Sequence, residues 1–218
     1  MKRRWICNSY FLSLSSVREL LRCSTIILVA ALISESSIAQ TYSLVIGVDG
    51  IGPYGLNAAP TPNLDRLMRG DWADGYRGSV TYHGLSGGAI GTSTQQATLS
   101  GPGWSSIHTG VWQDQHGVTN NSFSGSRFFT HPSYLKTLES HIPNIYTAGV
   151  VSWNPINDKI FAPVPGQPDI DFRQGTNEND SLTTLTAIAR LGGLQAAGNG
   201  AVFVHLDDVD IAGHVSGA

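Results

Sequence analysis

Apolar residues along the chain gather in short runs that are separated by polar, glycine-rich stretches. Residues 42–48 form a near-continuous run rich in β-branched side chains, which predicts a strand buried on both faces of a sheet. Residues 145–152 predict a second strand, and residues 201–206 predict a third, buried strand. Polar side chains follow the first and third strands directly.

Helical segments lie between these strands. Thr61 followed by Pro62 indicates a helix start, because a capping hydroxyl precedes a proline at the first helical position. Further helices are predicted at 102–109, 133–141 and 181–191, the last capped by Asp180 or Ser181. Residues 78–96, rich in Gly, Ser and Thr, predict a loop. The alternation favours an α/β fold with a mostly parallel sheet flanked by helices.

Composition narrows the class of protein. The 218 residues are 41% hydrophobic and 13% charged, enough for one sizeable core and too apolar for a disordered chain. The net charge is -3, and no run of five like charges occurs. A nucleic-acid polymer is therefore not the expected partner.

The first 39 residues differ from the rest. Basic residues precede the apolar run 26–33, which is followed by the small-x-small pattern Ser37-Ile38-Ala39. This predicts a signal peptide over residues 1–39 and export to the periplasm or the extracellular space. The alternative, a membrane anchor, needs about 20 apolar residues. Both Cys7 and Cys23 lie in this segment, so a metal in the mature chain would be held by Asp, His or hydroxyl oxygen.

Two acidic residues follow predicted strands. Asp49 comes directly after the first strand and Asp210 shortly after the third. Ligands of open α/β sheets bind at the carboxyl ends of the strands, so both carboxylates are candidates for a cation site. Asp49 taken alone is equally explained as a turn residue before Gly50.

Asp210 and His214 form a more specific pair. Their spacing of four residues lets both side chains face one cation on a helical turn, and Gly213 permits close backbone approach. Oxygen and imidazole ligands suit zinc, with manganese or iron as alternatives. The competing interpretation is a surface loop with an incidental histidine.

Residues 98–121 are unusually rich in glycine, hydroxyl and histidine. The sequence lacks a G-x-S-x-G elbow there, which argues against a serine esterase. His108 and His116 are interpreted as residues that orient the backbone or a loop. His205 is interpreted as a hydrogen-bonded core histidine, and Trp104 as a packing residue close enough to Ser100 to line a pocket.

Several motifs in order resemble the alkaline phosphatase superfamily: Asp49-Gly50, the 61–65 helix start, the 100–110 segment, His116-Gly117 and Asp210-x-x-Gly-His214. The resemblance is greatest to the type I phosphodiesterase and nucleotide pyrophosphatase branch, with the sulfatases as relatives. It spans residues 44–217, nearly all of the mature segment 40–218, which is expected to be the N-terminal part of an alkaline-phosphatase-like hydrolase domain.

The resemblance implies roles for individual residues. Ser100 takes the place of a nucleophile at a helix N-terminus, where a cation and backbone N–H groups assist it. Asn121, or Asn120 if the register shifts by one, takes the place of an asparagine that donates to a phosphate oxygen. Two divalent metal ions, expected to be zinc, are implied. Their implied ligands in this chain are Asp49, Ser100, Asp210 and His214.

The implied substrates are small-molecule phosphodiesters or nucleotide pyrophosphates, with phosphomonoesters next. A sulfatase is an alternative, but sulfatases have an arginine where this chain has Trp104, and often paired acids where it has Asp49-Gly50.

The family supplies an Asp-His pair and another His after the Asp-x-x-Gly-His motif. The sequence stops at Ala218, so we expect an N-terminal part of such an enzyme with weak or no activity. A non-catalytic secreted domain is the remaining alternative; the oligomeric state is not indicated.

Overall fold

The computed structural model describes residues 40–72, 75–81, 84 and 86–217, with the backbone alone for residues 53 and 54. The predicted signal peptide and both cysteines lie outside the described residues, as does part of the predicted 78–96 loop. What is described of that loop contains neither helix nor strand, as predicted. Among the described helices, none has the length and apolar character needed to cross a bilayer.

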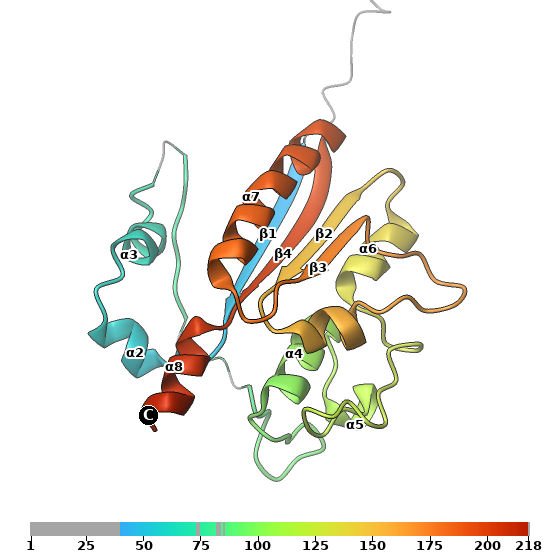
Figure 1. The fold of residues 1–218 in the computed structure, drawn as a ribbon, viewed down its shortest axis with the longest axis horizontal. Coiled ribbons are helices and arrows are strands. Elements are labelled where there is room, and N and C mark those ends of the chain that lie inside the picture. Colours follow the sequence, from blue (N-terminus) through green and yellow to red (C-terminus); the bar gives the residue numbers. More distant parts are fainter. Residues whose placement is uncertain (1–39, 73–74, 82–83, 85, 218) are drawn as a thin grey trace, which may run out of the picture. The chain divides into compact units, whose positions relative to one another are not determined.

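The centre of the fold is a four-stranded sheet in which every pairing is parallel. Its strands, in the spatial order β1-β4-β2-β3, are β1 (Thr41–Val48), β4 (Asn199–Leu206), β2 (Tyr146–Val151) and β3 (Phe172–Gly175). The α/β fold with a parallel sheet is thus confirmed (Figure 1). The sequence pattern missed β3, because its four residues FRQG carry no strand-like alternation.

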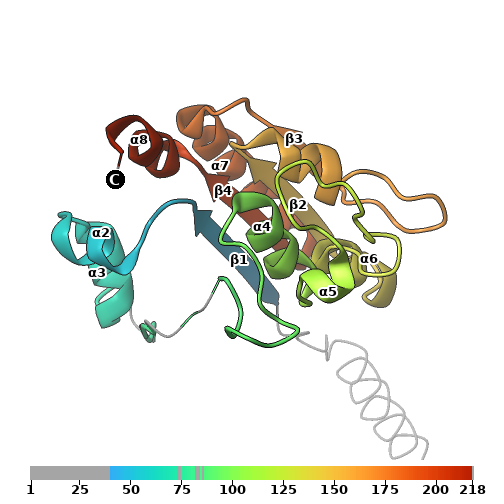
Figure 2. The ribbon, with the colours of Figure 1, turned by 90° about the horizontal axis from the view of Figure 1, so that it is seen from below.

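Helices cover both faces of this sheet. The helical elements are α2 (Pro53–Ala58), α3 (Pro62–Arg69), α4 (Ser100–Thr109), α5 (Gln113–His116), α6 (Tyr134–His141), the π-helix η1 (Ile156–Ile160), α7 (Asp180–Ala197) and α8 (Asp208–Ser216). Figure 2 shows α4 and α6 on one side of the sheet and α7 on the other. The two sides have separate cores because successive residues of a strand point to opposite faces.

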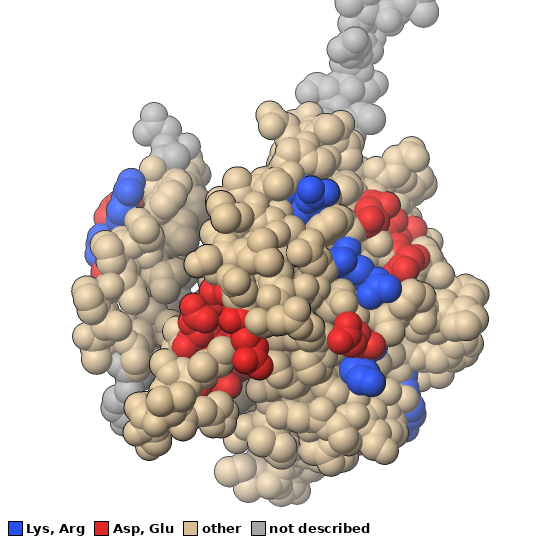
Figure 3. All heavy atoms as spheres, viewed as in Figure 1, with Lys and Arg blue, Asp and Glu red and all other residues tan. Residues whose placement is uncertain are grey.

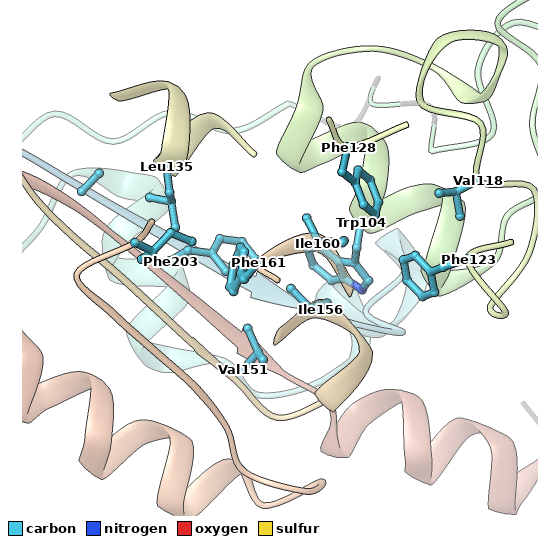
Figure 4. Packing of buried hydrophobic residues seen from close by; sticks show 12 residues of the cluster. Trp104, Val118, Phe123, Phe128, Leu135, Val151, Ile156, Ile160, Phe161 and Phe203 are labelled. Atoms are coloured by element: carbon cyan, nitrogen blue, oxygen red, sulfur yellow. The ribbon is translucent and has the colours of Figure 1, made fainter. Parts of the chain in front are cut away.

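The core on the α4 side is the more aromatic of the two. Phe203 of β4 packs there against Phe161, with ring centroids 6.2 Å apart, and against Trp104 of α4 at 5.9 Å. Figure 4 shows Trp104 between Phe123 on one side and Phe161 and Phe203 on the other. Val202 and Val204 point to the opposite face and pack under α7. The indole of Trp104 is therefore part of the core, and its position is set by packing.

The prediction that β1 is buried on both faces is wrong. Most of the strand is exposed, including Leu44 at 48% and Ile46 at 55%. β1 is the edge strand of the described sheet and pairs only with β4. A continuous apolar run identifies a strand, but its place in the sheet depends on partners that the run itself does not specify.

Helix positions agree with the predictions, and some ends differ. α3 begins at Pro62, and Ser133 caps α6 by accepting a hydrogen bond from the Leu135 N–H at 3.4 Å. α4 begins at Ser100, two residues before the predicted start. α7 is capped by Asn179, whose side chain accepts from the Leu182 N–H, so the predicted caps Asp180 and Ser181 are wrong. The Asp180 side chain instead contacts the amino end of α8.

Candidate active site

The first and last described strands bring their carboxyl ends together. In the register of β1 and β4, Val48 lies opposite Leu206, and the Asp49 N–H donates to the Leu206 carbonyl at 2.9 Å. Gly50 then turns the chain with a positive φ of 71°. A Cβ atom at Gly50 would lie 2.6 Å from the Cα of Asp210, so only glycine permits this approach. The β1 end and α8 thereby meet at one edge of the sheet.

A cavity of about 540 Å³ opens at this edge. Every residue that the sequence singled out for catalysis or metal binding lines it: Asp49, Ser100, Asn121, Asp210 and His214. Acidic side chains gather on the surface around the start of α8 (Figure 3). The structure therefore places in one cavity residues that are scattered over most of the sequence.

Ser100 is the first residue of α4 and is half-buried, and its side chain is one of the groups that lower the pKa of the Asp49 carboxyl. The amides of this first helical turn are largely used. The Gly101 N–H donates to Asn121 Oδ1 at 2.7 Å, Pro102 has no N–H, and the Gly103 N–H donates to the Leu99 carbonyl. Among the described residues the structure records no acceptor for the Ser100 N–H, which leaves one backbone donor for a bound anion.

Asn121 and Asn120 differ in what they can offer a ligand. Because Asn121 Oδ1 accepts from Gly101, its amide nitrogen is the end left to donate into the cavity. Asn120 Oδ1 accepts from both the N–H and the hydroxyl of Ser122 in a local turn, and Asn120 does not line the cavity. The geometry thus favours Asn121 over the alternative register.

The Asp49 carboxylate is held from several directions. Trp104 Nε1–H donates to Oδ2 at 2.9 Å, and the Gly50 N–H donates to Oδ1 at 3.0 Å. Nε2 of His205 lies 3.7 Å from Oδ2. Burial alone raises the pKa of this carboxyl, but the interactions with His205, Trp104 and Ser100 outweigh it and lower the pKa to about 2. Asp49 is therefore firmly ionised and fixed in orientation.

Asp210 and His214 lie one turn apart on α8, as predicted, with 3.3 Å between Oδ2 and Nε2. Their side chains are 28% and 82% exposed, compared with 19% for Asp49, so it is His214 that is open to solvent. The amino end of α8 is fixed from below by Asp180, whose two carboxylate oxygens accept the N–H groups of Asp207 and Asp208 at 2.9 and 3.0 Å. Asp180 thus sets the direction of the helix that carries the pair.

A second acidic group lies behind Asp49. Asp207 is buried, with Oδ1 4.0 Å from Nε2 of His205. Burial and the negative charges of Asp49, Asp210 and Glu178 raise its pKa to about 6, against the opposing effect of His205. One ligand-type atom each from Asp49, His205 and Asp207 lies within 4.8 Å of the others.

Sequence reasoning missed the role of His205 and Trp104 beside Asp49. His205 is fully buried, as expected, but its Nε2 has no hydrogen-bond partner within the described part of the chain. The expectation of a fully hydrogen-bonded core histidine is therefore wrong. The His205-x-Asp207 pattern at a strand end was the available signal, because alternation places both residues on the face that Phe203 identifies as the α4 side.

The other two histidines of interest serve structure. His116 Nδ1 accepts from the Val118 N–H at 3.0 Å, and its Nε2 lies 3.1 Å from the Ser106 hydroxyl, which donates to Gln96. His108 is buried among aromatic rings, and this burial lowers its pKa to about 3. Neither histidine lines the cavity.

The fold is an α/β fold with a cavity at the carboxyl ends of its parallel strands, which is where open α/β sheets bind their ligands. A model of the type I phosphodiesterase / nucleotide pyrophosphatase family matches residues 43–156, just over half of the chain. The chain belongs to this family and is a hydrolase of this kind; such enzymes act on small phosphate esters and typically depend on metal ions. Asp49, Ser100 and Asn121 fall within the matched segment. Searches of curated proteins and of solved structures found no match to this chain.

Proposed function

We propose that this chain is an exported, metal-dependent hydrolase of phosphodiesters or nucleotide pyrophosphates that uses Ser100 as its nucleophile. The cavity carries the proposal: the Ser100 hydroxyl, at the start of α4, shares it with two carboxylates, an imidazole and the Asn121 amide. Phosphomonoesters are the next substrate class. Export rests on the signal-like segment 1–39 alone.

The donors lining the cavity fit divalent metal ions. Carboxylate and hydroxyl oxygens from Asp49 and Ser100, and oxygen and nitrogen from Asp210 and His214, suit zinc. We assign the first pair to one ion and the second pair to another. Bound ions of this kind polarise a phosphoryl oxygen and lower the pKa of a coordinated hydroxyl.

Asp49 does not act as the general base for Ser100, although both side chains line the same cavity. A carboxylate whose pKa is held near 2 is a poor proton acceptor at neutral pH. A serine hydroxyl is in turn a weak nucleophile at neutral pH without help. Because Asp49 is too weak a base to activate Ser100, a metal ion is needed to do so. Asp49 is then expected to bind that ion rather than to accept the proton.

The reaction follows from where the chain's own groups lie. Ser100 Oγ attacks phosphorus and forms the Oγ–P bond as the bond to the leaving oxygen breaks in line. The hydroxyl proton of Ser100 passes to the leaving oxygen, so the leaving group departs as an alcohol or a nucleotide. Charge on the phosphoryl oxygens is stabilised by the amide nitrogen of Asn121 and by the Ser100 N–H at the amino end of α4. Water then cleaves the Oγ–P bond and restores the serine.

The test is hydrolysis by the full chain with added zinc of a bis-aryl phosphodiester, an aryl phosphate and an aryl sulfate. Ser100→Ala should abolish diester cleavage while leaving the fold intact by circular dichroism. Ser106→Ala is the matched control, since this serine lies in the same helix but does not line the cavity. Diester cleavage that survives Ser100→Ala would refute the proposal.

Two other outcomes identify the alternatives. Sulfate hydrolysis, together with a mass shift of the peptide containing Ser100 that reports formylglycine, would identify a sulfatase. Zinc binding without turnover of any of the three esters, also after the chain is extended by the Asp-His pair and the further His that the family supplies, would identify a non-catalytic domain.

A further inference from the structure

His205 occupies an unusual position for a buried histidine. Its side chain is fully buried at the carboxyl end of β4, and Nε2 lacks a hydrogen-bond partner among the described residues. Two carboxylate oxygens converge on this nitrogen, Asp49 Oδ2 at 3.7 Å and Asp207 Oδ1 at 4.0 Å. A buried polar atom is rarely left unpaired in a folded protein, so this arrangement requires an explanation.

The other ring nitrogen determines which tautomer is present. The backbone N–H of Trp153 donates to Nδ1 of His205 at 3.4 Å, so Nδ1 presents its lone pair. In a neutral imidazole the proton then resides on Nε2. An Nε2–H pointing toward two carboxylates is attracted to them, whereas a lone pair there would be repelled.

The ring is also prevented from turning. The indole of Trp104 packs edge-on against it, with centroids 4.7 Å apart and an interplanar angle of 83°. That indole fits because Gly47, opposite His205 in the β1–β4 register, has no side chain: a Cβ there would collide with the Trp104 ring. Trp104 and His205 therefore approach Asp49 Oδ2 as one packed unit.

We propose that His205 is a positioning residue that holds the Asp49 carboxylate in the orientation needed for metal binding, through an Nε2–H whose position the Trp153 amide determines. The proposal deepens the proposed function and rests on it for the role of Asp49 as a ligand. In this role His205 contacts the ligand Asp49 and does not itself bind the metal ion. A direct ligand would need a lone pair on Nε2, which would leave two protons facing each other between Nδ1 and the Trp153 amide.

The first experiment reads the tautomer of His205 in the full-length, metal-free chain labelled with 15N-histidine. Loss of a resonance in His205→Gln assigns the signal. Long-range ¹H–¹⁵N correlations should show a protonated Nε2 and an unprotonated Nδ1, and the Nε2–H should persist after zinc is added. A protonated Nδ1, or loss of the Nε2 proton on zinc binding, would overturn the proposal in favour of a metal ligand.

The second experiment measures zinc affinity by calorimetry for matched variants. Gln at 205 retains an N–H donor near the Nε2 position, whereas His205→Leu has similar bulk without a donor. We expect His205→Leu to weaken zinc binding by roughly 10- to 100-fold, the range seen when outer partners of metal ligands are removed, and His205→Gln to recover most of it. His141→Leu, on the exposed end of α6, is the control. Equal losses for Leu and Gln would contradict a donor role.

Neither readout depends on turnover, so failures can be told apart. If the tautomer and the order of zinc affinities are as expected but no ester is cleaved, the proposed reaction fails and the positioning role stands. If diester cleavage requires Ser100 but zinc affinity is unchanged in His205→Leu, the reaction stands and the positioning role fails. If the wild-type chain binds no zinc, the role of Asp49 as a ligand fails, and the positioning role with it.

Discussion

Asp49 and Asp210 line the same cavity, but their surroundings differ greatly. Asp49 accepts hydrogen bonds from Trp104 and from the Gly50 amide beside buried His205, and its side chain is 19% exposed. Asp210 contacts His214 on the surface of α8. The Asp49 carboxylate is held by donors from the core before any ligand arrives, whereas the partner that the structure records for the Asp210 carboxylate is the exposed His214. The following predictions test this difference, from the largest expected effect to the smallest.

Replacing Gly50 should disturb the contact between the end of β1, which carries Asp49, and α8, which carries Asp210. Gly50→Ala forces a Cβ to within 2.6 Å of the Asp210 Cα at a positive φ, so we expect a loss of about 3 kcal/mol in the free energy of unfolding. Gly91 is the control, since it has a similar φ of 77° and no atom near its Cβ position. Urea denaturation of both variants measures the difference. Equal losses would show that φ strain, and not the contact with α8, explains the effect.

Removing each carboxylate should reveal which one the core depends on. Asp49→Ala leaves the Trp104 Nε1–H without its acceptor, at a cost of about 2 kcal/mol in metal-free protein. Asp210→Ala should change stability by less than about 0.5 kcal/mol, because no buried donor depends on that carboxylate within the described part of the chain. Thermal or urea unfolding without metal gives both values. A larger loss in Asp210→Ala would invert the comparison.

The buried surroundings of Asp49, which include Asp207, should also make the stability of the fold depend on pH. The folded-state pKa of Asp207 is raised to about 6 from an ordinary value of 3.8, so stability falls as the pH rises through this interval. We expect the metal-free chain to lose on the order of 1 kcal/mol or more between pH 4 and pH 6 through this group. Asp207→Asn should flatten the profile in that window. An unchanged slope would exclude Asp207 as its source.

Coupling energies should give the smallest but most specific contrast. A double-mutant cycle of Trp104→Phe with Asp49→Ala should give a coupling of about 1 kcal/mol, because the pair shares a largely buried hydrogen bond. A cycle of Asp210→Ala with His214→Ala should give less than about 0.5 kcal/mol, as is usual for exposed pairs. Urea denaturation supplies both cycles. Similar coupling energies would show that Asp49 and Asp210 are held equally firmly by their partners.

Much of the fold could be predicted because it is encoded locally. The continuous apolar runs identified β1, β2 and β4, and the Thr61-Pro62 pair marked the start of α3. β3 could not be found this way, since its polar residues become a strand only by pairing with β2. The cap of α7 was misassigned because Asn179, Asp180 and Ser181 are all good capping residues in sequence.

The same division applies to the candidate site. Their places after predicted strands and their spacing named Asp49, Asp210 and His214, and the resemblance to the superfamily named Ser100 and Asn121. The spacing of Asp210 and His214 predicted that both can lie on one helical turn, as they do in α8. A helix has a fixed period, so a separation of four residues determines a shared face.

Only the tertiary structure revealed what orients these groups. The sequence identified His205 as a core histidine and Trp104 as a packing residue able to line a pocket. Their roles beside Asp49 depend on how α4 packs over β1 and β4. The exposure of β1 depends likewise on its place at the edge of the sheet. The physical reason is common to both: periodicity and capping act over a few residues, whereas burial and hydrogen-bond partners are set by segments that meet only in the folded chain.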